Sequence, residues 1–224
     1  MAQQLRLSLR GPPALTRETY VAGGSNAGAI AALDAWPAWP GGCLALVGPP
    51  GVGKSHLAQA WATRVGAQEL DAAAPDLGSA QGSPVLIEDV DRGVDPEGLF
   101  HLINLAAANG QGLLLTARTL PATWPAALPD LRSRLNALLV AEIDEPDDEV
   151  LTGVLKKFFR ELYIRPADDV YPYLLKRMRR TIPGALEIVE RLHQPDGLAS
   201  RAISRALARQ ILEDGNENLD LFEG

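Results

Sequence analysis

Several features of exported and membrane proteins are missing from this sequence. It contains a single cysteine, Cys43, so no disulfide framework can form, which favours a reducing compartment. No apolar run approaches the roughly 18–20 residues that a membrane span requires. The N-terminus has no apolar segment of the kind found in secretory signals. These absences together predict a cytoplasmic protein without a membrane partner.

Positively charged residues are fewer than negatively charged ones. The chain has 21 Lys and Arg against 28 Asp and Glu, a formal net charge of −7. This balance argues against a surface built mainly to hold nucleic acid, so we expect no direct DNA binding. Hydrophobic residues make up 46% of the 224 residues, enough for one large domain or a core domain with a small satellite.

A glycine-rich stretch, GPPGVGKS at residues 48–55, is the most informative part of the sequence. It fits the phosphate-loop pattern G-x-x-x-x-G-K-[ST], between an apolar run at 43–47 and a helix-like run at 55–63. Backbone N–H groups of such a loop wrap a phosphate, and the following helix N-terminus adds partial positive charge. The sequence therefore predicts a site for a nucleoside diphosphate or triphosphate.

Within this stretch, Lys54 is expected to reach the β- and γ-phosphates, and the Ser55 hydroxyl is expected to ligate Mg²⁺. The predicted cofactor contacts of the loop are Gly48, Pro49, Pro50, Gly51, Val52, Gly53, Lys54, Ser55 and His56.

A second motif follows an apolar strand at residues 84–87, which ends in the acidic sequence EDVD. An apolar strand that ends in acids downstream of a phosphate loop is the Walker B arrangement. By position, Glu88 is the Mg²⁺ ligand and Asp89 the catalytic group that orients the attacking water. A solvated acidic strand end is the alternative.

The remaining pattern alternates strands with helices. Strands are predicted at 43–47, 84–87, 113–116 and 137–143, with a short one within 70–83, and helices at 27–36, 55–63 and 98–109. Such alternation predicts an α/β fold with a parallel sheet and the nucleotide at the carboxyl ends of the strands. Thr116 at one of these ends is expected to contact the nucleotide near its γ-phosphate.

From residue 146 onward the pattern is helical, with helices predicted at 148–163, 168–180, 183–193 and 198–213. We therefore expect four parts: a flexible N-terminal peptide (1–13), a nucleotide-binding α/β domain (14–145), a small helical lid domain (146–214) and an acidic tail (215–224).

These motifs together resemble the AAA+ family, and within it the DnaA/Hda branch. The segment KSHL at 54–57 is similar to the Lys-Thr-His-Leu form of that branch, and YVAGGSN at 20–26 resembles its adenine-side linker. The resemblance covers residues 19 to about 213. It implies that Tyr20 and Val21 contact the adenine nucleotide.

The same resemblance implies functional roles for two arginines, Arg134 and Arg180. The sequence LRSRL at 131–135 is similar to the box that ends in an arginine finger, which implies that Arg134 is a catalytic residue for a neighbouring subunit's nucleotide. Arg180 resembles the sensor 2 arginine, which touches the bound phosphates from the lid, and Arg179 fits that role less well.

The sequence also departs from the branch. Glu88 stands where DnaA usually has aspartate, Arg118 stands where the sensor 1 segment often ends in aspartate, and Asp130 replaces a second arginine found in some relatives. Only the nucleotide-binding core and the lid are recognisable here, which is the layout of Hda-type proteins.

The N-terminal peptide QLRLSL, residues 4–9, alternates polar and apolar residues. An extended peptide of this kind can bury Leu5, Leu7 and Leu9 in a partner groove while Gln4 bonds at its edge, although the same pattern also suits an edge strand. The peptide is similar to the clamp-binding hexapeptide of Hda, which implies the sliding clamp (the DNA polymerase III β subunit) as partner. Residues 218–222, NLDLF, are a weaker candidate, with a solvated tail as the alternative.

The resemblance thus implies a negative regulator of replication initiation, associated with the replisome. It would bind ADP or ATP with Mg²⁺, dock on the DNA-loaded clamp, and promote hydrolysis of ATP bound to DnaA, with weak ATPase activity of its own and possible self-association. Two other interpretations stay open: an AAA+ adaptor of the helicase-loader type, and a DnaA paralogue that contacts DNA directly through its basic run at 176–180.

Overall fold

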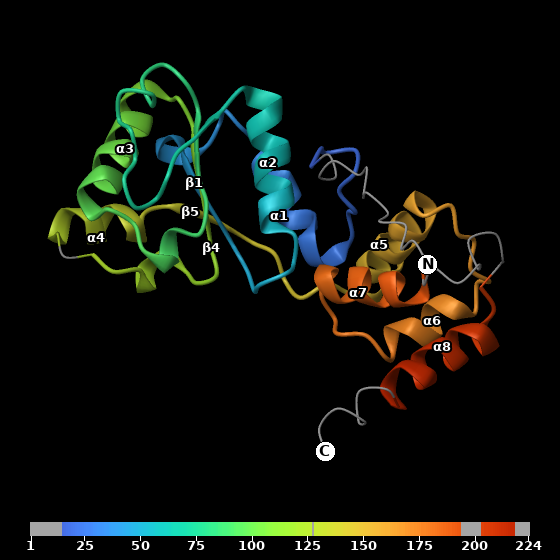
Figure 1. Cartoon of the computed structure of the whole chain (residues 1–224). Helices are drawn as coiled ribbons and strands as arrows, with labels where there is room; N and C mark the ends of the chain where they lie inside the picture. The colour runs from blue at the N-terminus through green and yellow to red at the C-terminus, as the bar shows by residue number, and fades with distance from the viewer. Residues whose placement is uncertain (1–14, 127, 194–202, 218–224) are drawn as a thin grey trace, which may run out of the picture.

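The computed structural model describes residues 15–126, 128–193 and 203–217. A sheet domain with helices on both faces is followed by a group of helices that we call the lid (Figure 1). The α/β fold with a parallel sheet, predicted from the alternation of strands and helices, is confirmed.

The sheet has five parallel strands in the order β2-β3-β4-β1-β5. Their bounds are Cys43–Val47 (β1), Gln68–Glu69 (β2), Val85–Ile87 (β3), Leu113–Ala117 (β4) and Leu139–Glu142 (β5). All residues of β1, β3 and β4 are buried, as expected for central strands covered on both faces. Because the strands are parallel, their carboxyl ends lie along one edge, where the phosphate loop follows β1.

Two helix layers cover the sheet, and the alternation of side chains along β1 separates their cores. Ala45 faces α3 (Pro96–Asn109) and α4 (Pro129–Asn136), whereas Leu44 and Leu46 face α1 (Ala27–Asp34) and α2 (Lys54–Val65). Figure 1 shows α3 and α4 on the side of the strands away from the lid. Short 3₁₀ turns occupy Gly24–Asn26, Pro40–Gly42, Val90–Arg92 and Pro121–Thr123.

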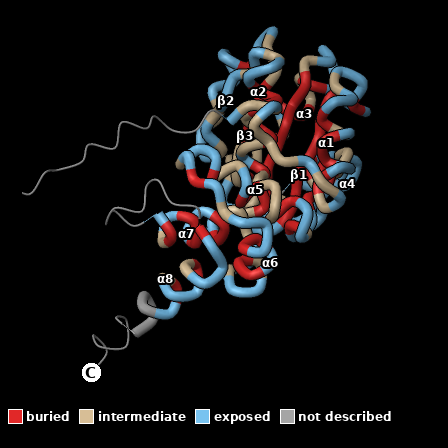
Figure 2. Tube along the Cα trace, turned by 90° about the vertical axis from the view of Figure 1, so that its right-hand side faces the viewer, coloured by how far each residue is buried: buried red, intermediate tan, exposed pale blue. Residues whose placement is uncertain are grey.

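The lid consists of α5 (Asp148–Glu161), α6 (Val170–Leu175), α7 (Ile182–Leu192) and α8 (Arg205–Glu217). It has a hydrophobic core of its own, built around Phe159, Leu174 and Val189. Figure 2 shows buried residues on the inner faces of these helices and exposed ones on the outer faces. No helix in the described ranges is long and apolar enough to cross a membrane.

Three predicted elements differ from the structure. The helix predicted at 198–213 is Arg205–Glu217, because residues 203 and 204 are not helical and the Ser204 hydroxyl accepts a hydrogen bond from Leu207 N–H at the start of α8. Residues 70–83 contain no strand. The strand that pairs with β3 is β2, Gln68–Glu69, which ends just before this stretch. The stretch itself is rich in Ala, Gly and Asp, which have low strand propensity. The helix predicted at 168–180 is only Val170–Leu175. It cannot run on into α7, since Thr181 is extended (φ −141°, ψ 159°) and caps α7 by accepting a hydrogen bond from Gly184 N–H.

Candidate nucleotide-binding site

The phosphate loop connects β1 to α2 in the strand–loop–helix order that the sequence predicts. Gly51 and Gly53 have φ of +76° and +101°, a region that residues with a Cβ atom rarely adopt. Both are also crowded: a Cβ on Gly53 would meet the Tyr20 ring at 3.2 Å, and one on Gly51 would meet Pro183 at 3.0 Å. Glycine is therefore required here by conformation and by close approach.

Lys54, the first residue of α2, is folded against this loop. Its Nζ donates hydrogen bonds to the carbonyls of Gly48 (2.7 Å) and Pro49 (2.9 Å), which leaves one of the three ammonium N–H donors for another acceptor. Burial lowers the pKa of Lys54, and the nearby carboxylate of Asp89 acts in the opposite direction. The structure thus places a cation among loop carbonyls, next to the acids that follow β3.

Ser55 and Glu88, the two predicted Mg²⁺ ligands, lie together at the edge of the sheet. Burial raises the pKa of Glu88, and a hydrogen bond with the Ser55 hydroxyl partly offsets that effect. Glu88 Oε1 is buried and has no hydrogen-bond partner among the described residues. A buried carboxylate oxygen beside a serine hydroxyl fits Mg²⁺, which takes one or two protein ligands along with phosphate oxygens and water.

Asp89 and Thr116 hold the turn after β3. The Asp89 main chain is left-handed (φ 53°), and its N–H donates a 3.0 Å hydrogen bond to Thr116 Oγ1. The Asp89 carboxylate forms an exposed ion pair with Arg92 at 3.1 Å. Thr116 is buried, so its described contact orients the Walker B turn, and a contact with the γ-phosphate remains a prediction.

Asp91 is a site residue that the sequence analysis did not single out. Its Oδ2 accepts a 2.9 Å hydrogen bond from the main-chain N–H of Arg118, which ties the turn after β3 to the end of β4. Its Oδ1 is buried without a partner in the described part of the chain. The charge of Arg118 lowers the pKa of Lys54, and that of Asp91 raises it. The only signal in the sequence was its place two residues after the Walker B pair.

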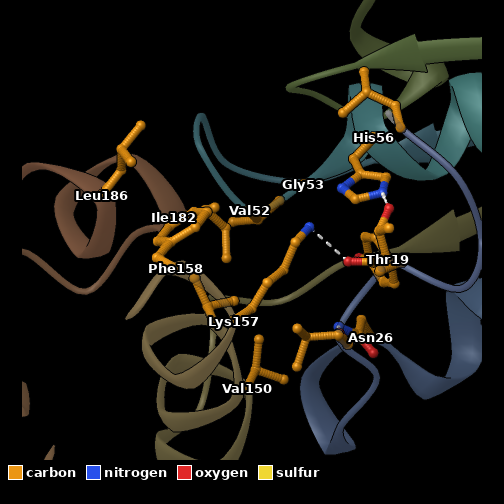
Figure 3. A pocket seen from close by; sticks show the side chains of 14 residues that line it. Thr19, Asn26, Val52, Gly53, His56, Val150, Lys157, Phe158, Ile182 and Leu186 are labelled. Carbon is orange, nitrogen blue, oxygen red and sulfur yellow. Dashed lines mark hydrogen bonds between the residues drawn. The ribbon is translucent and has the colours of Figure 1, made fainter. Parts of the chain in front are cut away.

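A cavity of about 220 Å³ lies between the phosphate loop, the 19–26 linker and the lid (Figure 3). Apolar side chains from all three parts line it, among them Tyr20, Val21, Val52, Val150 and Phe158. Such a pocket beside a phosphate loop suits the flat face of a nucleobase. It brings together Tyr20 and Val21, which are predicted to contact the adenine nucleotide, and His56, which is predicted as a cofactor contact of the phosphate loop.

The polar groups of this cavity are held in place. His56 Nε2 lies 2.9 Å from the carbonyl of Thr16 and 3.1 Å from Thr19 Oγ1, and the His56 ring packs edge-on against Tyr20. Burial lowers the pKa of His56 and raises that of Tyr20 to about 12, so both rings are neutral at pH 7. On the lid side, Lys157 Nζ donates a 2.7 Å hydrogen bond to the Thr19 carbonyl, drawn in Figure 3.

The lid touches the phosphate loop directly. Ile182 N–H, at the start of α7, donates a 2.9 Å hydrogen bond to the Gly51 carbonyl. Arg180, the predicted sensor 2 residue, lies two residues earlier, where its guanidinium pairs with Asp148 at 2.7 Å and with the Pro146 carbonyl at 3.3 Å. Arg179 pairs with Glu187 on the lid itself. These contacts hold the Arg180 guanidinium at the start of the lid, and its contact with the phosphates stays a prediction.

Arg134, the predicted finger, is exposed on α4. It lies one short turn before Leu139, the first residue of β5, which pairs with Leu44 at the start of β1. The phosphate loop follows the other end of β1, about 13 Å further along at ~3.3 Å per residue. Arg134 thus lies away from the phosphate loop of its own chain.

The predicted clamp-binding residues Gln4, Leu5, Leu7 and Leu9 lie outside the described residues, as does the segment 218–222.

In sequence, this chain is similar to bacterial DnaA proteins. The DnaA protein of Geobacter sulfurreducens is 25% identical over 234 residues, which cover 90% of this chain and 52% of that protein. The chain thus spans about half the length of this relative. No protein-family model matches the chain.

Solved structures of DnaA proteins share the fold of this chain. Domain III of the Thermotoga maritima replication initiation protein DnaA superposes with a TM-score of 0.70 at 18% identity, covering 91% of this chain and 97% of that domain. The fold is that of DnaA domain III. The AMPPCP-bound DnaA of Aquifex aeolicus superposes on this DnaA-like domain with a TM-score of 0.71 at 17% identity, covering 95% of this chain and 73% of that one. The resemblance to the DnaA-like AAA+ proteins is thereby confirmed at the level of fold.

Proposed function

We propose that this chain is a negative regulator of replication initiation, which holds an adenine nucleotide and promotes hydrolysis of ATP bound to DnaA. Relation to DnaA along 90% of the chain supports a role at initiation, and the AMPPCP bound to the Aquifex protein supports adenine as the base. In this proposal it is an Hda-type protein that acts in the cytoplasm at the replisome.

The nucleotide, ADP or ATP, would lie across the edge of the sheet. The backbone of residues 48–56 and Lys54 would hold the phosphates, while Tyr20 and Val21 would face the base in the apolar cavity. Ser55 and Glu88 would hold Mg²⁺, which neutralises phosphate charge when bound. The tight packing of Gly51 against the lid supports a link between the bound nucleotide and the position of the lid.

The observation that carries the proposal is the position of Arg134. An exposed guanidinium away from its own phosphate loop is available to a second protein. A guanidinium placed at a γ-phosphate stabilises the charge of the transition state and contributes about 10³–10⁵-fold in rate. Arg134 would therefore act on ATP in DnaA rather than on the nucleotide of this chain, whose own ATPase activity would be weak.

Docking on the DNA-loaded sliding clamp would bring the two AAA+ proteins together. Residues Gln4, Leu5, Leu7 and Leu9 would form the anchor, which rests on the resemblance of the peptide alone. Tethering of this kind raises the local concentration of Arg134 at DnaA without any new contact between them.

The test is hydrolysis of DnaA-bound ATP in the presence of clamp loaded on DNA. We expect Arg134→Ala to abolish the stimulation, and Arg134→Lys to recover little of it, because lysine lacks the planar fork of donors. Exposed Arg160→Ala, with equal loss of charge, is the control and should stimulate normally. Normal stimulation by Arg134→Ala would contradict the proposal.

Clamp anchoring is tested separately with Gln4→Ala, which should lose clamp binding while it still binds nucleotide. If the chain bound the replicative helicase and hydrolysed ATP by itself, without an effect on DnaA, the helicase-loader function would replace this one.

A further inference from the structure

A second cavity, of about 520 Å³, lies on the lid between α6 and α8. It shares no residue with the nucleotide cavity. Figure 1 shows α6 and α8 at the end of the lid remote from the sheet. Its lining is Tyr173, Arg177, Arg205, Ala206, Arg209 and Glu213.

Positive charge dominates this lining. Three arginines converge on it against the single carboxylate of Glu213, in a chain whose net charge is −7. Glu213 pairs with Arg209 at 2.8 Å, whereas neither Arg177 nor Arg205 has an ion pair with any described residue. Like charges repel when they are brought together, so an anion in the cavity would relieve a cost that the fold otherwise carries.

The arginines are held over an aromatic ring. The guanidinium carbon of Arg177 lies 3.8 Å from the Tyr173 ring centroid, and that of Arg205 lies 5.5 Å from it. Cation–π contact of this kind orients a guanidinium plane and leaves its N–H edge free to donate. One N–H of Arg177 is already directed at the Tyr173 carbonyl, at 3.5 Å.

Tyr173 supplies an independent sign of a binding site. Its side chain is 5% exposed, and its hydroxyl is buried without a hydrogen-bond partner in the described ranges. A buried hydroxyl without a hydrogen-bond partner destabilises the fold, and a polar ligand that bonds to it removes that cost.

We propose that this cavity binds a phosphate group. Several guanidinium groups with free N–H edges match the oxygens of phosphate, which accept paired hydrogen bonds from arginine. The phosphate would belong either to the backbone of a single-stranded nucleic acid or to a small soluble phosphate compound. Arg205 and Arg209 donate to it from α8, and Arg177 donates from the turn after α6.

The test uses the full-length protein with saturating ADP and Mg²⁺, so that the phosphate loop is filled. Inorganic pyrophosphate and a fluorescein-labelled oligothymidylate are titrated separately, by calorimetry and by fluorescence anisotropy. We expect Arg205→Gln to weaken binding roughly tenfold or more, the effect of one lost charged hydrogen bond. Exposed Arg165→Gln removes the same charge elsewhere on the lid and should leave binding unchanged.

The two ligands distinguish the two sources. Binding of pyrophosphate alone, sensitive to Arg205→Gln, identifies a small phosphate compound. Binding of the oligothymidylate identifies a nucleic-acid strand. In that case each arginine that contacts a phosphate should change the slope of log K against log salt by about 0.7.

Three results would overturn the proposal. These are no binding of either ligand, equal loss in Arg205→Gln and Arg165→Gln, or a preference for polyglutamate over pyrophosphate, which would assign the cavity to an acidic peptide. Repetition with Lys54→Ala separates this site from the phosphate loop, because the cavity should still bind pyrophosphate when that loop is disabled.

Discussion

The main-chain N–H of Ile182 donates a 2.9 Å hydrogen bond to the carbonyl of Gly51. This bond joins the first turn of a lid helix to the loop that is expected to wrap the phosphates. A ligand that reorients the loop must therefore either keep this bond or break it. This main-chain bond is therefore a direct link through which a ligand at the loop would affect the lid.

Substitution of Gly51 by alanine should disturb this junction. A Cβ there would meet Pro183 at 3.0 Å, and the residue has φ +76°. We expect a loss of about 1–2 kcal/mol in unfolding free energy and weaker nucleotide binding, measured by thermal denaturation with and without ADP. The control is Gly28→Ala in α1, where nothing lies within 4 Å of the added atom. It should be stabilising by about 0.5–1 kcal/mol.

Thr116→Val should destabilise the turn that carries the Walker B acids. The substitution keeps the shape of the side chain but removes the Oγ1 that accepts Asp89 N–H. A buried donor left without a partner costs about 1–3 kcal/mol, which chemical denaturation can measure. Thr116→Ser retains the hydroxyl and should lose less stability. An equal loss in both variants would show that the methyl group, and not the hydrogen bond, matters.

His56 should make stability depend on pH. Burial lowers its pKa below the ordinary 6.5, so the unfolded chain binds the proton more tightly than the folded one. The contribution of neutral His56 to the free energy of unfolding is therefore fully present above pH 6.5 and decreases as the pH falls below that value. The difference in melting temperature between wild type and His56→Gln should narrow between pH 7.5 and 5.5. Exposed His101→Gln on α3 is the control substitution, measured in parallel.

Removal of Mg²⁺ should act through Ser55 and Glu88. We expect EDTA to reduce the increase in melting temperature that ATP produces, since a ligand stabilises by RT ln(1 + [L]/Kd). Ser55→Ala should bring the effect of ATP with Mg²⁺ down to that seen with EDTA. If Ser55→Ala kept the full dependence on Mg²⁺, the proposed ligand pair would be wrong.

The sequence predicted most of the sheet domain because its strands are short apolar runs and its motifs are local. Residues 48–55 are contiguous, so their loop follows from composition and spacing. The short β2 could not be placed, since Gln68 and Glu69 have no strand-like pattern and are extended only by pairing with β3.

The candidate site was predictable where it follows from motifs and from the topology of the sheet. Glu88 beside Ser55 is such a case, because the carboxyl ends of parallel strands meet at one edge. The pairing of Arg180 with Asp148 and the bridge from Asp91 to Arg118 could not be predicted, because they depend on side-chain directions that no sequence pattern encodes.

The separate core of the lid has a consequence for unfolding. Within the described ranges, few polar bonds join it to the sheet domain, among them those of Lys157 to Thr19, Ile182 to Gly51 and Ser25 to Asp147. A unit with its own apolar core and few outside ties opens as a foldon, at a lower free energy than the whole molecule. Amide hydrogens of α5 and α7 should therefore exchange before those of β1 and β4. A nucleotide that contacts both units would merge the two openings into one cooperative event.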